Sequence, residues 1–309
     1  MQKPSFIMRA IHFSLLVTIV LFLDACTAKG ELGTEKNPVK LFFIPSVEAQ
    51  MLDDKSKVFK EYLEKNTPYK FKVSVPNSYI AVVEAFGTER ADVAALNTFG
   101  YLLANSKYGT EARLTVIRFG SDTYRGQIIA KSDGPIKKLE DIAGKKFAFV
   151  DPVSTSGYLL PSKIMQDKGI KPSDTVFANK HDTVVTMIYQ NQVDAGATFY
   201  SPEENGEIQD ARRLVKKQYP DIEKKISIIQ LTDSIPNDPI VFRKTMPEEM
   251  KVAITKALLA FVQTPDGQAA FKDLYGVTAL KESNDQAYDP IREIMKALGK
   301  DVADMLVKK

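Results

Sequence analysis

The sequence predicts an α/β protein of two lobes with a ligand cleft between them. Short apolar, β-rich runs alternate with helical patterns, an alternation typical of α/β layers around mainly parallel sheets. The alternation restarts near residue 127, and 309 residues suffice for about two domains, each with its own core. A cleft between two such lobes is a preferred place for a small ligand.

The first series of elements contains four strands and three helices. Ser78 has the side chain and the position of an N-cap for the second helix. The predicted strands are 39–44, 71–75, 92–96 and 114–119, and the predicted helices are about 56–66, 79–86 and 98–105.

The second series contains five strands, and a helical block follows it. Gly169 suits the end of a helix, and Pro247 and Pro265 suit helix starts. The predicted strands are 127–131, 146–150, 175–178, 193–197 and 225–231, with a helical turn at 139–143 and helices at 157–168 and 182–190. Beyond Pro236 the chain is predicted to be helical, at 247–263, 265–275 and about 286–298.

No linker rich in Gly, Ser or Pro separates the two series. We therefore expect strand-like crossings near 124–126 and 231–241. Two crossings make the first lobe discontinuous. The predicted first lobe is 38–124 with 239–309, and the second is 125–238, with both hinge crossings.

The N-terminus reads as a processing signal. Lys3 and Arg9 precede the apolar run Ala10–Leu23, which is short for a membrane span but fits a signal peptide over residues 1–25. Leu-Asp-Ala-Cys, ending at Cys26, resembles the lipobox of bacterial lipoproteins, which implies lipidation of that cysteine and an extracytoplasmic, membrane-anchored protein. An uncleaved anchor with a buried thiol is the alternative. The polar stretch 26–37 is predicted to be a flexible tether.

The composition excludes several classes of protein. A hydrophobic content of 44% and a charged content of 26% are ordinary for a globular chain and exclude a disordered or polytopic membrane protein. The 42 Lys and Arg are nearly matched by 39 Asp and Glu, so a nucleic-acid partner is not expected. One cysteine excludes an internal disulfide and an all-cysteine metal site.

The segment Asp151–Tyr158 (DPVSTSGY) follows a predicted strand and opens a helix. Its three hydroxyls and the free amides of a helix start favour an oxyanion, because a helix N-terminus carries partial positive charge. Residues 155–165 contain no acid, which leaves these donors available to an external anion. The alternative is that Ser154 or Ser156 only caps the helix.

Several motifs together resemble the phosphonate/phosphite/phosphate-binding lipoproteins of ABC importers. They are D-P-x-S-T-S-G-Y-L-x-P at 151–161, Ser-Tyr at 78–79, His181 followed by Val-Asp at 193–194, and I-P-x-D-P-I-V at 235–241. The resemblance spans about 39–298. It implies a periplasmic-binding-protein fold of the two-hinge (type II) class, which captures a small oxyanion by lobe closure and delivers it to a membrane permease.

The resemblance also implies ligand-binding residues in both lobes. Three consecutive hydroxyls would hold the phosphoryl oxygens, a phenol and an imidazole would donate to them, and a carboxylate would face the far side of the ligand. These residues are Ser154, Thr155, Ser156, Tyr79, His181 and Asp238, with Asn97, Thr98 and Tyr124 as additional candidates. Ser201 stands where relatives that bind 2-aminoethylphosphonate have a glutamate, which favours phosphite, methylphosphonate or phosphate.

Each of these residues also has a structural interpretation. His181 could be a solvated neighbour of a helix cap, Tyr79 a core aromatic and Asp238 a turn residue before a proline. Asn97 with Thr98 could be a plain cap. Arg125, at the first crossing, is interpreted as a surface residue rather than an anion partner.

The motifs expected of an enzyme are missing from the sequence. One histidine lies beyond the signal segment, and no P-loop, G-x-S-x-G or H-E-x-x-H motif is present. We therefore predict a binding protein without a cofactor or metal. The alternatives are a sulfonate, sulfate or organophosphate receptor, and a phosphoryl-handling enzyme or sensor domain on the same fold.

Overall fold

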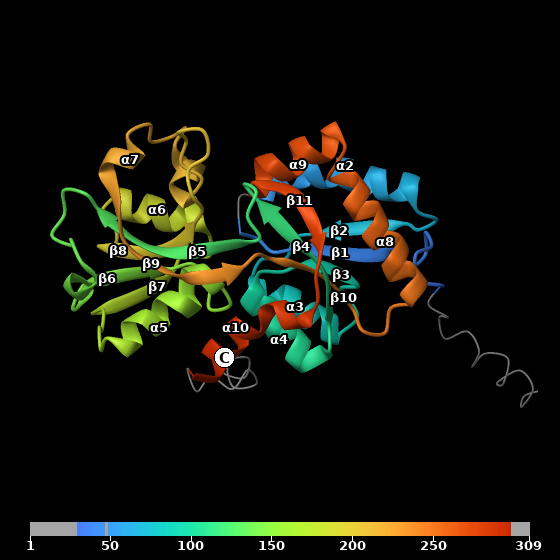
Figure 1. The fold of residues 1–309 in the computed structure, drawn as a ribbon, viewed down its shortest axis with the longest axis horizontal. Helices are drawn as coiled ribbons and strands as arrows, with labels where there is room; N and C mark the ends of the chain where they lie inside the picture. The colour runs from blue at the N-terminus through green and yellow to red at the C-terminus, as the bar shows by residue number, and fades with distance from the viewer. Residues whose placement is uncertain (1–29, 47–48, 298–309) are drawn as a thin grey trace, which may run out of the picture.

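The computed structural model describes residues 30–46 and 49–297, apart from the side chains of 49–56 and 273–275. These residues form two lobes, each built on one sheet with helices on both faces (Figure 1). The predicted signal peptide and Cys26 lie outside the described residues. No helix within the described ranges is long and apolar enough to cross a membrane.

The first lobe is built from both ends of the described chain. Its N-terminal part contains β1 (Val39–Phe43), α2 (Ala49–Asn66), β2 (Phe71–Ser74), α3 (Tyr79–Gly87), β3 (Val93–Ala95), α4 (Thr98–Tyr108) and β4 (Glu111–Arg118). Its C-terminal part contains β10 (Pro239–Phe242), α8 (Glu248–Phe261), α9 (Pro265–Tyr275), β11 (Val277–Glu282), η4 (Asp285–Tyr288) and α10 (Asp289–Ala297).

The second lobe is one continuous stretch. It contains β5 (Thr123–Lys131), η1 (Leu139–Ile142), β6 (Lys146–Phe149), η2 (Thr155–Leu159), α5 (Leu160–Asp167), β7 (Asp174–Phe177), α6 (His181–Tyr189), β8 (Ala195–Tyr200), η3 (Ala211–Val215), α7 (Ile222–Lys225) and β9 (Ile226–Pro236).

Both sheets are mixed, so the prediction of mainly parallel sheets is wrong. The strand orders are β11-β4-β10-β3-β1-β2 and β7-β6-β8-β5-β9. Only the pairs of β1 with β2 and β3, and of β6 with β7 and β8, are parallel. Antiparallel pairs join β10 to β3 and β4, β11 to β4, and β5 to β8 and β9.

The prediction that the chain is only helical beyond Pro236 is also wrong. β10 is a short strand whose four residues are all buried, because it lies between β3 and β4 in the middle of the first sheet. Four residues are short for a strand, and Asp238 followed by Pro239 is typical of a turn, so the sequence predicted a crossing here. β11 is an edge strand with a half-exposed pattern, which weakens its alternation of apolar residues.

The remaining predicted elements are present, with shifted ends. α2 begins at Ala49 rather than near residue 56, and β9 continues to Pro236. Ser78 caps α3 as predicted, because its hydroxyl accepts a hydrogen bond from Ala81 N at 3.3 Å. The helix predicted over 157–168 begins earlier, as the π-type turn η2, and continues as α5.

Residues 30–37, predicted to belong to a flexible tether, form an ordered turn on the first lobe. Gly33 N donates to Asn37 O at 2.8 Å, and Lys70 N donates to Gly33 O at 2.7 Å. Leu32 packs against the apolar cluster beneath. The polar composition of this stretch did not indicate these backbone hydrogen bonds. Because residues 30–37 are ordered, the tether predicted over 26–37 is too long at its C-terminal end.

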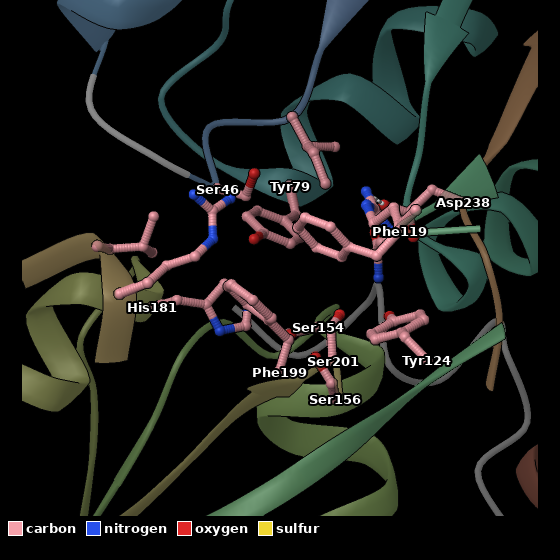
Figure 2. Close-up of a pocket in the computed structure, with 15 residues that line it drawn as sticks. Ser46, Tyr79, Phe119, Tyr124, Ser154, Ser156, His181, Phe199, Ser201 and Asp238 are labelled. Atoms are coloured by element: carbon pink, nitrogen blue, oxygen red, sulfur yellow. Dashed lines mark hydrogen bonds and ion pairs between the residues drawn. The ribbon is translucent and has the colours of Figure 1, made fainter. Parts of the chain in front are cut away.

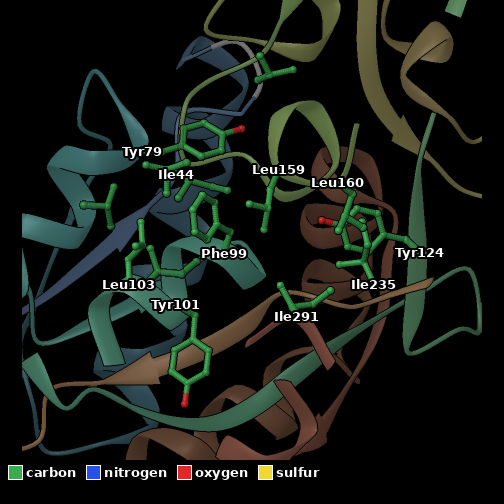
Figure 3. Packing of buried hydrophobic residues seen from close by; sticks show 14 of the residues in the cluster. Ile44, Tyr79, Phe99, Tyr101, Leu103, Tyr124, Leu159, Leu160, Ile235 and Ile291 are labelled. Carbon is green, nitrogen blue, oxygen red and sulfur yellow. The ribbon is translucent and has the colours of Figure 1, made fainter. Parts of the chain in front are cut away.

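The two crossings run side by side between the lobes. Asn237 N donates to Asp122 O at 2.9 Å, and its side-chain amide donates to Ser121 O at 2.8 Å. An apolar cluster continues across the junction and includes Phe99 of the first lobe, Leu159 of the second and Ile291 of α10 (Figure 3). The lobes are therefore joined by packing as well as by covalent connection.

Candidate functional site

A pocket of roughly 60 Å³ lies between the lobes. The first lobe and the first crossing contribute Ile44, Ser46, Tyr79, Asn97, Arg118 and Phe119, and Asp238 comes from the second crossing. The second lobe contributes Tyr124, Ser154, Ser156, His181, Phe199, Ser201, Arg213 and Leu214. In Figure 2, Ser46 and Tyr79 point into the pocket from one side. The side chains on the other side are Ser154, Ser156, Ser201, Phe199 and His181.

The start of η2 places two serine hydroxyls at the pocket. Ser154 Oγ accepts a hydrogen bond from Gly157 N at 3.0 Å, so Ser154 caps the helix and also lines the pocket. A Cβ at position 157 would overlap the side chain of Val150, a buried residue just after β6. Glycine is therefore needed for the helix start to lie this close to the strand. The capping and ligand-binding interpretations of Ser154 are compatible.

Two predicted contacts, Thr155 and Thr98, do not line the pocket. Thr155 Oγ1 instead accepts hydrogen bonds from Phe99 N at 2.9 Å and from the Asn97 side-chain amide at 3.1 Å. Thr98 Oγ1 donates to Pro236 O at 2.7 Å, in the strand that leads to the second crossing. Both hydroxyls therefore connect the lobes beside the pocket.

Tyr79 is buried at the first position of α3, with 1% of its surface exposed. It belongs to the apolar cluster and also lines the pocket, so its core and site interpretations hold together. Its backbone hydrogen-bonds Asp151 of the other lobe, which also accepts from Val153 N at 2.7 Å. Burial raises the pKa of Asp151, and these backbone hydrogen bonds partly offset the rise.

His181 lies in the pocket as the first residue of α6 and is 6% exposed, which excludes the solvated-cap interpretation. Its ring meets that of Phe199 edge to face, with 5.0 Å between centroids. Burial, and to a lesser degree the charge of Arg118, lower the pKa of His181 to about 3. The imidazole is therefore neutral at physiological pH and keeps one N–H donor.

Asn97 and Tyr124, two of the additional candidates, line the pocket. The Asn97 amide nitrogen donates to Val153 O at 2.7 Å across the lobes. Burial and the charge of Asp238 raise the pKa of Tyr124, which keeps its phenol protonated. Arg125, by contrast, is exposed and outside the lining residues, as predicted.

Asp238 lines the pocket, and its carboxylate is paired. Arg118 Nη2 donates to Asp238 Oδ2 at 2.6 Å, and each side chain is 15% exposed. Arg118 was not predicted from the sequence, because it is one of 42 basic residues and its partner is 120 positions away. The pairing excludes the interpretation of Asp238 as only a turn residue.

Three further pocket residues lie outside any recognisable motif and were not predicted: Arg213, Phe199 and Phe119. Phe119 begins the first crossing with φ at 48°, in the left-handed region that a bulky residue rarely adopts. Its ring packs against Gly276, where a Cβ would overlap it. Strained backbone of this kind is concentrated at functional sites.

No metal site is evident in the described part of the chain, where no three His, Cys, Asp or Glu side chains are grouped. The pocket instead presents hydroxyl, phenol, amide and imidazole groups to its interior. Such groups bind an oxyanion by hydrogen bonding.

The two lobes, the two crossings and the pocket between them define a type II periplasmic binding protein. A structure of a binding protein component of an ABC phosphonate transporter from Pseudomonas aeruginosa has a TM-score of 0.74 and 19% identity, covering 86% of this chain and 96% of that one. PhnD1 from Prochlorococcus marinus in complex with methylphosphonate has a TM-score of 0.73 and 17% identity, covering 85% and 98%.

The family follows from the sequence as well. The family model described as ABC transporter, phosphonate, periplasmic substrate-binding protein matches residues 41–288, and the chain belongs to this family. The chain is 26% identical over 290 residues to the phosphonates-binding periplasmic protein of Escherichia coli, covering 91% of this chain and 82% of that protein. Periplasmic substrate-binding proteins work outside the cytoplasm.

Proposed function

We propose that this chain captures phosphite, a small phosphonate or phosphate by lobe closure and delivers it to an ABC permease. The observation that carries the proposal is the pocket between the lobes, with Ser154, Ser156 and His181 on one side and Tyr79 on the other. An anion that engages both sides at once stabilises the apposed lobes and shifts the population toward them.

The size of the pocket supports a small ligand. Roughly 60 Å³ holds about four to six water-sized groups. This is room for a phosphorus atom with its oxygens and one small substituent.

We propose binding without turnover. The imidazole of His181 is a poor general base, because burial suppresses its protonation, and the carboxylate of Asp238 is engaged by Arg118. The described pocket residues thus offer hydrogen-bond donors rather than an activated nucleophile.

The remaining parts of the proposal concern the lobes and the anchor. We place the first lobe at 38–122 with 239–297 and the second at 123–238, two residues before the boundary predicted from the sequence, because β5 begins at Thr123. Residues 1–25 are removed, and lipid on Cys26 holds the mature protein at the outer face of a membrane. Cell fractionation tests this: a Cys26→Ser variant should be recovered in the soluble fraction, and its retention in membranes would contradict lipid anchoring.

Calorimetry with the purified protein tests the ligand. Phosphite, methylphosphonate, 2-aminoethylphosphonate, phosphate and sulfate form the panel. Ser156→Ala should weaken binding of the preferred ligand about 10- to 150-fold, since a hydrogen bond to a charged group contributes about 1.5–3 kcal/mol. Ser173→Ala, at an exposed serine of the same lobe, is the matched control and should bind as the wild type does.

Three results would contradict the proposal. Unchanged affinity in Ser156→Ala would reject the assigned site. Sulfate binding as tight as that of the phosphorus ligands would reject the ligand class. Hydrolysis of a phosphate ester by the pure protein would reject a role limited to binding.

A further inference from the structure

The pocket contains an ion pair whose position bears on ligand choice. Arg118 is the last residue of β4, and Asp238 lies between β9 and β10, so the pair bridges the bases of the two crossings. Both side chains line the pocket. The Tyr124 ring lies 5.7 Å from the Arg118 guanidinium carbon, which adds a favourable cation–π contact.

The pairing changes what Asp238 offers to a ligand. A lone carboxylate at this place would attract an ammonium group, but here the guanidinium already compensates its charge. Asp238 Oδ1 has no hydrogen-bond partner within the described residues. The pair therefore presents one acceptor oxygen with little net attraction for a cation, which suits the hydroxyl of a protonated phosphorus oxyanion.

The other described groups around the pocket offer no replacement for that carboxylate. Asp238 is the only acid among the described lining residues. Ser201, nearly buried, contributes a hydroxyl, while Ile44, Phe119 and Phe199 contribute apolar surface. An ammonium group entering this pocket would lose its hydration without gaining a free anionic partner, which is costly.

We propose that Arg118 is a specificity-determining residue that limits the site to phosphorus oxyanions whose remaining substituent is uncharged. Its ion pair with Asp238 leaves that carboxylate unavailable to an ammonium group, so the site rejects 2-aminoethylphosphonate. This inference rests on the proposed function, because it concerns discrimination among ligands of the same site.

Calorimetry with methylphosphonate and 2-aminoethylphosphonate tests the inference. The wild type should bind methylphosphonate at least 100-fold more tightly. Arg118→Met keeps an apolar stem and frees Asp238, so its affinity for 2-aminoethylphosphonate should rise at least tenfold. Adding Asp238→Asn should abolish that gain. Arg125→Met removes an exposed arginine outside the pocket lining and should leave the selectivity unchanged.

Arg118→Lys keeps the positive charge and should still reject 2-aminoethylphosphonate, so the test survives if the methionine variant does not fold. Equal wild-type binding of the two ligands would overturn the inference while leaving the proposed function intact. A folded Arg118→Met variant without the gain, or a gain in Arg118→Lys, would also overturn it. Failure of the wild type to bind any ligand of the panel would reject the proposed function itself, and this inference with it.

Discussion

Thr155 provides the sharpest test of how the lobes close. Its hydroxyl accepts two hydrogen bonds from the first lobe, from Phe99 N at 2.9 Å and from the Asn97 amide at 3.1 Å, and it is 1% exposed. Thr155→Val keeps the shape of the side chain and removes the acceptor. We expect this change to destabilise the apposed lobes, because two buried donors lose their partner.

The size of the effect follows from those two donors. Each buried donor left without an acceptor costs about 1–1.5 kcal/mol at the low end of measured values. In separated lobes both donors can bind water, so the cost of about 2–3 kcal/mol falls on the closed state alone. Ligand affinity should then drop about 30- to 150-fold, since every 1.4 kcal/mol is tenfold.

Calorimetric titration of Thr155→Val with the preferred ligand measures this drop, and thermal unfolding of the ligand-free protein reports on the fold. Thr155→Ser keeps the hydroxyl and is the matched control. We expect the serine variant to bind within a few-fold of the wild type. Wild-type affinity in a well-folded Thr155→Val protein would refute the assignment of these hydrogen bonds to closure.

Three further predictions concern His181 and two glycines. Between about pH 6.5 and 3 the unfolded state binds a proton that folded His181 does not, so the free energy of unfolding should fall with acidification, by up to about 1.4 kcal/mol per pH unit. Urea unfolding at several pH values should show a weaker pH dependence of this free energy in His181→Gln. Gly157→Ala overlaps Val150 and should lower the free energy of unfolding by about 1–3 kcal/mol in thermal or urea unfolding. Gly276→Ala, at φ 66°, overlaps the Phe119 ring and should weaken ligand binding in calorimetry, and normal affinity would exclude a role for that ring.

Local sequence signals accounted for the elements whose patterns are self-contained. The N-cap at Ser78 and the opening of a helix after β6 were predictable, because each depends on residues within three or four positions, although the helix begins at Thr155 rather than at the predicted residue 157. The strand at β10 was not, since its four residues carry too little periodicity and its place is fixed by β3 and β4, far away in the chain.

The site was predictable to the extent that its residues lie in motifs. Ser156 and His181 lie in the pocket as predicted, but Arg118 could not be assigned because only the fold brings it to Asp238. Thr155 lies in the predicted segment, but its hydroxyl accepts from Phe99 N of the other lobe, because the sequence cannot tell a hydroxyl that faces a pocket from one that faces the neighbouring lobe.

The position of β10 has a consequence for the order of folding. The second sheet is complete within one uninterrupted stretch, Thr123–Pro236, and needs no later part of the chain. In the first sheet β10 lies between β3 and β4 and forms hydrogen bonds with both, whereas β3 and β4 do not pair with each other. The ribosome synthesises β10 only after the whole second lobe. Contacts at such long sequence separation form slowly. Refolding should therefore be biphasic, with the second lobe structured first, and a chain truncated before Pro239 would expose the unpaired edges of β3 and β4.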